Sequence, residues 1–146
     1  MPRNSPRPGL TRVLDPRVII VSFLEYELHL LTLKADWNYA ISGNRHHFLV
    51  KAIRRNRVIG RAHGWFSPND LFVLQKIELD QQHRSRGYGT SIIQELREEA
   101  RNQSCSSFIF SDVQRSNIRA VRLYESLNAT PTDGSPEACK FVLTPP

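Results

Sequence analysis

Arginine and glycine recur in a short segment near the middle of the chain, and this combination suits the binding of phosphate. Glycine has no Cβ, so it permits a positive φ and lets the backbone approach a ligand closely. Arginine guanidinium groups bind phosphate through charge and through paired hydrogen bonds. The segment consists of Arg84, Ser85, Arg86, Gly87, Tyr88, Gly89 and Thr90.

The surrounding residues place this segment between a strand and a helix. Upstream, apolar residues at alternate positions end in Ile77 and Leu79, which predicts a strand over 71–80. Downstream, apolar residues from Ile92 to Ala100 recur at three- and four-residue steps, which predicts an amphipathic helix. The first amides of such a helix lack intrahelical acceptors, and its dipole favours an anion. On these residues alone, a surface turn with incidental arginines remains the alternative.

The spacing Arg-x-x-Gly-x-Gly argues against two common nucleotide-binding motifs. A dinucleotide fold needs Gly-x-Gly-x-x-Gly, and a P-loop needs a following Gly-Lys-Ser/Thr. A second motif is formed downstream by Asn117, Ala120, Leu123, Tyr124 and Glu125. Together the two motifs resemble the GNAT superfamily of N-acetyltransferases, which has Gln/Arg-x-x-Gly-x-Gly/Ala after its fourth strand and Asn-x-x-Ala-x-x-Leu-Tyr-Glu in the helix after its fifth.

The resemblance covers about residues 47 to 143 and implies an α/β fold. In this fold a mixed, mainly antiparallel sheet of six to seven strands is flanked by helices. Residues 112–127 are more weakly similar to the bacterial ribosomal-protein N-terminal alanine acetyltransferases, whose pattern is an acidic residue, Val, two variable residues, Ser, Asn and a tyrosine-bearing helix. Two positions depart from the family pattern. Ser85 stands where the family often has glycine, and Asn128 replaces the glycine after the helix, where asparagine tolerates the left-handed conformation.

The resemblance also implies that acetyl-CoA binds at the connection between strand and helix, as a cosubstrate. Its diphosphate would contact the backbone of residues 84–90, and its pantetheine arm would pair with the backbone of Ile77 and Leu79. The Leu79 amide would then donate a hydrogen bond to the oxyanion. Asn117 would either contact acetyl-CoA or cap the helix that follows it, and both alternatives stay open.

The same resemblance suggests the residues that move protons. Tyr124 is the predicted general acid, because a phenol with an ordinary pKa near 10 stays protonated at neutral pH and can release its proton to a thiolate of comparable basicity. The alternative is that Tyr124 only packs with the apolar residues of its helix. Asp112 matches the acidic base of the alanine acetyltransferases, and Glu78, beside the expected thioester, is the other candidate base.

Charge and cysteine content bear on partners and compartment. Lysine and arginine together number 20 against 14 for aspartate and glutamate, which gives a net charge of +6. This charge fits an anionic partner such as coenzyme A, a ribosome or RNA. It also fits a basic surface that is only solvated and binds no partner. Cys105 and Cys139 occur without a secretory signal, which predicts free thiols and a cytoplasmic location. The apolar run 18–24 is too short to span a bilayer, and the histidines lack ligands at metal-binding spacing, so we expect neither a membrane span nor a metal.

Along the chain, a flexible arm over 1–16, rich in proline and arginine, precedes a single N-acetyltransferase domain over 17–146. Residues 17–36 fit a strand or a helix. The resemblance implies a first strand there and one or two short helices over 24–46, which would roof an open acceptor site. Further strands are predicted over 47–54, 57–67, 106–111 and 138–143.

These observations predict an acyltransferase that moves acetyl from acetyl-CoA to a primary amine by direct attack. The acceptor would be a protein N-terminus, a lysine or a small amine. Two other functions stay open. One is a domain that binds acetyl-CoA without turnover, as a sensor or interaction module, and the other is a toxin-like enzyme that acetylates aminoacyl-tRNA.

Overall fold

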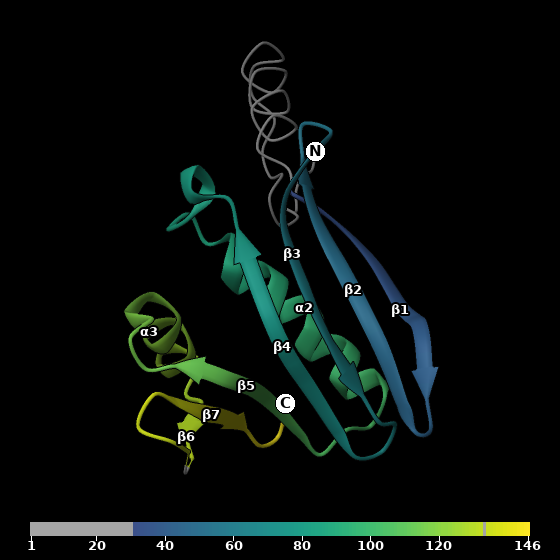
Figure 1. The fold of residues 1–146 in the computed structure, drawn as a ribbon. Helices are drawn as coiled ribbons and strands as arrows, with labels where there is room; N and C mark the ends of the chain where they lie inside the picture. The colour runs from purple at the N-terminus through teal and green to yellow at the C-terminus, as the bar shows by residue number, and fades with distance from the viewer. Residues whose placement is uncertain (1–30, 133) are drawn as a thin grey trace, which may run out of the picture.

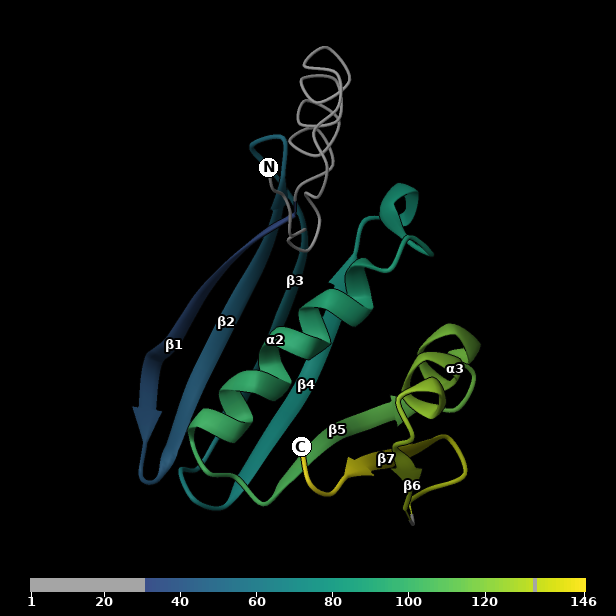
Figure 2. The same cartoon turned by 180° about the vertical axis from the view of Figure 1, so that it is seen from behind.

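The computed structural model describes residues 31–132 and 134–146. The predicted arm over 1–16 and the apolar run 18–24 lie outside the described residues. The described part forms a seven-stranded sheet in the order β1-β2-β3-β4-β5-β7-β6, with helices α2 and α3 packed on it (Figures 1 and 2). This is the mixed sheet flanked by helices that the sequence predicts.

The first four strands form an antiparallel meander in which neighbours along the chain are neighbours in the sheet. The connection between the second and third strands is the hairpin turn at Arg55 and Asn56, whose φ angles of 54° and 62° suit the right-handed twist of the paired strands. The predicted break at these two residues is confirmed. The strands are β1 (Thr32–Ser42), β2 (Arg45–Arg54), β3 (Arg57–Phe66) and β4 (Leu71–Leu79).

The expectation of roofing helices over 24–46 is wrong for its described part, residues 31–46. This part is strand β1 and the turn into β2, with Gly43 at φ 62°. The reason is a period of two: Leu33 and Ala35 lie directly opposite Ala52 and Val50 of β2, which are buried in the core. Within the described residues, β1 and β2 are therefore joined by a tight hairpin.

A crossover through α2 (Tyr88–Asn102) connects β4 to the parallel strand β5 (Ser107–Gln114). A short 3₁₀ turn, η1 (Gln81–His83), follows β4. Beyond β5 come α3 (Ile118–Ser126), the two-residue strand β6 (Thr130–Pro131) and β7 (Ala138–Leu143), which pairs with both β5 and β6. The strand predicted over 106–111 thus continues three residues further.

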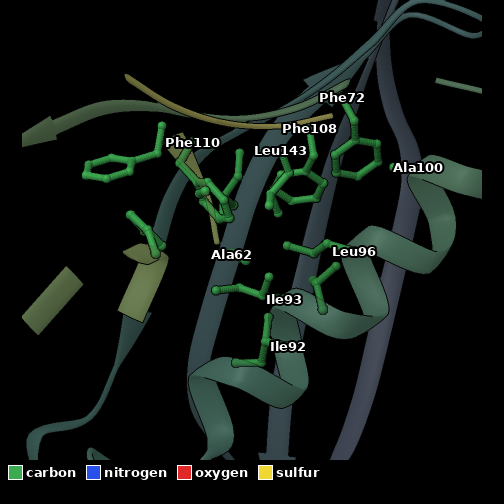
Figure 3. Close-up of a cluster of buried hydrophobic side chains, with 14 of the residues drawn as sticks. Ala62, Phe72, Ile92, Ile93, Leu96, Ala100, Phe108, Phe110 and Leu143 are labelled. Atoms are coloured by element: carbon green, nitrogen blue, oxygen red, sulfur yellow. The ribbon is translucent and has the colours of Figure 1, made fainter. Parts of the chain in front are cut away.

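One face of the sheet carries the core. Figure 3 shows Ile92, Ile93 and Leu96 of α2 directed toward Ala62 and the aromatic rings of Phe72 and Phe108. These six side chains are at most 1% exposed, and burying a large apolar side chain contributes about 1.5–3 kcal/mol. This packing fixes α2 across β3 and β4, and with it the position of the loop that precedes the helix (Figure 2).

Helix α3 ends in the left-handed conformation that the sequence predicts. Asn128 has φ 67°. The amide of Asn128 donates to the Glu125 carbonyl at 2.9 Å, and the amide of Ala129 donates to the Tyr124 carbonyl at 3.1 Å. This pair of bonds satisfies carbonyls that the helix end leaves free. Asn128 thus adopts the left-handed conformation that glycine usually takes at this position.

Cys105 and Cys139 are both free and buried, and burial raises the pKa of the Cys105 thiol. No helix within residues 31–132 and 134–146 is long and apolar enough to cross a bilayer.

Candidate active site

The parallel strands β4 and β5 pair only over their first halves and then diverge. Their register runs from Leu71 opposite Ser107 to Leu74 opposite Phe110, and beyond this point the two strands separate (Figure 1). At the branch point the Ser111 hydroxyl donates to the Leu74 carbonyl at 3.5 Å. The separation leaves a cleft of about 590 Å³, within the usual range for small-molecule sites.

The backbone of β4 presents hydrogen-bonding groups to this cleft. The Asp80 amide donates to Ile59 of β3 at 2.8 Å, so residues in phase with Asp80 direct their backbone groups toward β3. The alternate residues, Ile77 and Leu79, direct theirs toward the cleft. In agreement, the Leu79 carbonyl accepts a hydrogen bond from Arg84 Nε at 3.0 Å, from the side away from β3.

The loop before α2 leaves the first amides of the helix without protein acceptors. Gly87 is the N-cap, and it has no side chain with which to cap the helix. The first intrahelical bond runs from the Ser91 amide to the Gly87 carbonyl at 3.1 Å. The amides of Tyr88, Gly89 and Thr90 therefore remain available to an anion, with the positive end of the helix dipole behind them.

The two glycines of this loop have different roles, which corrects the expectation that both permit a positive φ. Only Gly87, at φ 83°, and Ser85, at φ 62°, are left-handed in this loop. Gly89 is helical, and a Cβ there would meet Leu123 Cδ2 at 3.5 Å and Leu79 Cδ1 at 3.8 Å, which are ordinary contacts. The protein itself thus accommodates a Cβ at Gly89.

Of the three arginines in or beside this loop, Arg84 and Arg119 line the cleft and Arg86 does not. Arg84 lines it, and its bond to the Leu79 carbonyl fixes the guanidinium there. Arg86 is exposed and does not line it. Arg119 of α3 also lines the cleft and donates to the Ser85 hydroxyl at 2.6 Å, so it ties α3 to the loop. The sequence analysis missed Arg119, although it lies within the Asn-x-x-Ala motif.

Tyr124 lies in the wall of the cleft, in apolar surroundings. Its ring stacks on Phe110 with centroids 4.0 Å apart and contacts Phe141 at 5.8 Å, and the side chain is 5% exposed. Within the described residues its hydroxyl makes no hydrogen bond. Burial raises the pKa of Tyr124 to about 12. The phenol is therefore a weaker acid than its ordinary pKa near 10 suggests.

Asp112 also lines the cleft, from a β-bulge of β5. Ser111 and Asp112 together face a single residue of β7, and Asp112 has φ 53°. The bulge lets Phe110 and Val113 both face the core, although only two residues lie between them and a regular strand would turn one of them away. The exposed Asp112 carboxylate lines the cleft as a result.

Glu78 lines the cleft from the other strand, but its carboxylate has a partner. It pairs with Lys76 at 3.2 Å, and both side chains are well exposed. Asn117 also lines the cleft, and its side-chain oxygen accepts from the Ala120 amide at 3.2 Å. The capping alternative for Asn117 is therefore what the structure contains, and the amide nitrogen of this side chain remains for other contacts.

The structure thus brings most predicted site residues to one cleft. Ser85, Arg86, Gly87, Tyr88 and Thr90 do not line it, and they stand in the adjoining loop. No group of three or more His, Cys, Asp or Glu side chains in the described ranges is arranged to hold a metal ion. The predicted residues that line the cleft are Ile77, Glu78, Leu79, Arg84, Gly89, Asp112, Asn117 and Tyr124.

Comparison with known families decides the identity of this fold. The sequence model of the acetyltransferase (GNAT) family matches residues 16–129. The chain belongs to this family of acyltransferases. Among curated proteins, no sequence matches the chain.

Solved GNAT structures share the fold at low sequence identity. A GNAT family acetyltransferase from Elizabethkingia anophelis, with acetyl-CoA bound, has 12% identity and a TM-score of 0.64, covering 78% of this chain and 97% of its own. The ribosomal-protein-S18-alanine N-acetyltransferase of Escherichia coli has 14% identity and a TM-score of 0.63, covering 80% and 94%. The PaiA N-acetyltransferase of Thermoplasma acidophilum, in complex with coenzyme A, has 14% identity and a TM-score of 0.61, covering 66% and 59%.

Proposed function

We propose that this GNAT protein is an acetyl-CoA-dependent N-acetyltransferase that acetylates a primary amine by direct attack. The observation that carries the proposal is the cleft between β4 and β5, bordered at one end by the unpaired amides of α2. Two solved structures with this fold have acetyl-CoA or coenzyme A bound.

Acetyl-CoA supplies the acetyl group as a thioester. The amides of Tyr88, Gly89 and Thr90 would bind its diphosphate, and the Arg84 guanidinium adds a full positive charge beside them. Gly89 fits this role, because it has no side chain to hold a ligand away from its backbone. The backbone of Ile77 and Leu79 would hold the pantetheine arm as an added strand.

Three groups would then act on the reaction. The Leu79 amide donates a hydrogen bond to the negative charge that develops on the acetyl oxygen. Asp112 accepts the proton of the attacking amine, directly or through water, and we assign it this role ahead of Glu78 because Glu78 is paired with Lys76. Tyr124 donates its hydroxyl proton in a hydrogen bond to the departing thiolate.

The test separates catalysis from binding. Thiol release is measured from acetyl-CoA with a panel of peptides and small amines, and calorimetry measures acetyl-CoA affinity independently. We expect saturable binding and amine-dependent thiol release. Binding without release over the whole panel would instead indicate a sensor domain, and transfer confined to aminoacyl-tRNA would indicate the toxin-like enzyme.

A further inference from the structure

The face of the sheet turned away from α2, which we call the far face, carries three cations in one row. Lys34 of β1 lies directly opposite Lys51 of β2, and Lys51 lies directly opposite Arg61 of β3. Lys51 stands between Val50 and Ala52, which are buried under α2, so its side chain points to the far face. We call Lys34, Lys51 and Arg61 the cation row.

This row is unfavourable for the sheet itself. Like charges directly opposite each other on neighbouring strands destabilise the pair. Within the described part of the chain, none of the three has an ion-pair or hydrogen-bond partner. Two acidic side chains, Asp36 and Glu78, lie on the same face, but Asp36 accepts from the Asn38 amide at 3.1 Å. A row of like charges without partners among the described residues is the arrangement expected of a surface that binds an anion.

The cation row leads to the cleft. Arg61 lies directly opposite Glu78 of β4, and both Glu78 and Lys76 line the cleft. Neighbouring strands are about 4.8 Å apart, so Arg61, Lys51 and Lys34 stand roughly 5, 10 and 14 Å from the β4 wall. An extended peptide rises about 3.4 Å per residue and would cover this distance within its first five residues.

The cleft also has walls from both faces of the sheet. Leu123 and Tyr124 line it on the α2 side, and Lys76 and Glu78 line it on the far face. Acetyl-CoA bound at the start of α2 therefore leaves the far face for a second substrate. That substrate would meet the cation row on its way to the cleft.

Resting on the proposed function, we infer that the acceptor is a polypeptide N-terminus with acidic residues among its first five positions, held by the cation row. An α-amine has an ordinary pKa near 8, so much of it is already neutral near physiological pH, whereas a lysine amine with a pKa near 10.4 needs a stronger base. The exposed Asp112 suits the α-amine better.

A peptide fits this face better than a nucleic acid. Single-stranded nucleic acids stack their bases on free aromatic rings. Trp65, on the far face beside the row, has its ring under the Arg45 guanidinium, with 3.9 Å from Arg45 Cζ to the ring centroid. That ring is already covered, and the exposed ring of Tyr39 lies against His47 rather than at the cation row, so charge pairing is the means of recognition that the row offers.

The experiment compares two synthetic peptides that both begin with alanine. In one peptide four aspartates follow the alanine, and in the other four asparagines follow it. The full chain is assayed for kcat/KM with both, at low and high ionic strength, and labelled peptide measures binding without turnover. We expect the aspartate peptide to be preferred at low salt, with the preference lost at high salt. Lys51→Gln and Arg61→Gln should each reduce this preference by about threefold, and Lys51→Glu should reverse it, so that the asparagine peptide is preferred.

Arg122→Gln, at an exposed cation of α3 that does not line the cleft, is the matched control and should leave the preference unchanged. Equal rates for the two peptides, or a preference that survives Lys51→Glu, would overturn this inference while leaving the proposed function intact. Cation-dependent transfer to aminoacyl-tRNA without peptide discrimination would overturn it too. Failure to bind acetyl-CoA or to acetylate any amine would be a failure of the proposed function instead.

Discussion

Replacing Tyr124 with phenylalanine removes one hydroxyl from the wall of the cleft and should separate chemistry from packing. The ring stacks on Phe110 and contacts Phe141, and phenylalanine keeps both contacts. The hydroxyl has no hydrogen-bond partner among the described residues, so its loss leaves no buried group unpaired. We therefore expect the free energy of unfolding to stay the same or to rise slightly.

The size of the kinetic effect follows from the pKa of the phenol. Burial raises the pKa of Tyr124 to about 12, whereas a thiol has an ordinary pKa of about 8.5. Complete proton transfer to the thiolate would be uphill by roughly 5 kcal/mol at about 1.4 kcal/mol per pKa unit. Tyr124 therefore acts chiefly as a hydrogen-bond donor to the developing charge. Removing one such donor from a preorganised site typically lowers kcat by about 10²–10³-fold.

Single-turnover release of the thiol from acetyl-CoA is the assay, because it reports the chemical step. Calorimetry should show acetyl-CoA affinity within about threefold of wild type, since the hydroxyl acts on charge that appears only in the transition state. Tyr39→Phe is the control, because Tyr39 is 54% exposed and lies on β1. A wild-type single-turnover rate in Tyr124→Phe would refute the assignment. An alkaline limb near pH 10 that this variant abolishes would refute the argument from burial.

Three further outcomes are expected. Gly89→Ala should fold as stably as wild type, because its Cβ meets only ordinary contacts, yet calorimetry should show at least tenfold weaker binding of acetyl-CoA; equal affinity would contradict a close approach of the ligand to the backbone. Gly87→Ala should instead lower the melting temperature, because a φ of 83° strains alanine. Asp112→Asn keeps a residue that tolerates a φ of 53°, so the fold should be preserved. This variant should lower kcat/KM about tenfold or more near pH 7 and less near pH 9, where more of the amine is already neutral. An unchanged pH profile in Asp112→Asn, with the loss of kcat/KM found in Glu78→Gln instead, would make Glu78 the base. The pKa of Tyr124, raised above its ordinary value of 10, contributes stability that is complete below pH 10 and is lost as pH rises toward 12, so alkaline unfolding should weaken the wild type by up to about 3 kcal/mol more than Tyr124→Phe over that interval.

Local sequence patterns predicted most of the sheet and the position of the cleft. The turn at Arg55 and Asn56, the strand before the glycine loop and the left-handed Asn128 all follow from short-range preferences, and the structure contains each of them. Such features depend on residues close in sequence, so they are accessible without the fold.

Three features depended on packing between distant residues and were missed or mistaken. The family resemblance implied helices over 24–46, and the pairing of Leu33 and Ala35 with Ala52 and Val50 of β2 makes the described part of this segment a strand instead. Arg119 lies 34 residues beyond Ser85, and only the docking of α3 beside the loop brings the two together. The raised pKa of Tyr124 likewise depends on burial against Phe110 and Phe141, which the sequence of its own helix does not reveal.

The central claim is that the cleft between β4 and β5, with the amides at the start of α2, binds acetyl-CoA. Calorimetric titration of acetyl-CoA into the full chain and into Gly89→Asp tests it most directly, since aspartate adds bulk and negative charge where the diphosphate would lie, while its Cβ makes only ordinary contacts with the protein. The account predicts saturable one-to-one binding to wild type and none to the folded variant. No binding to wild type, or equal binding to both, would contradict it.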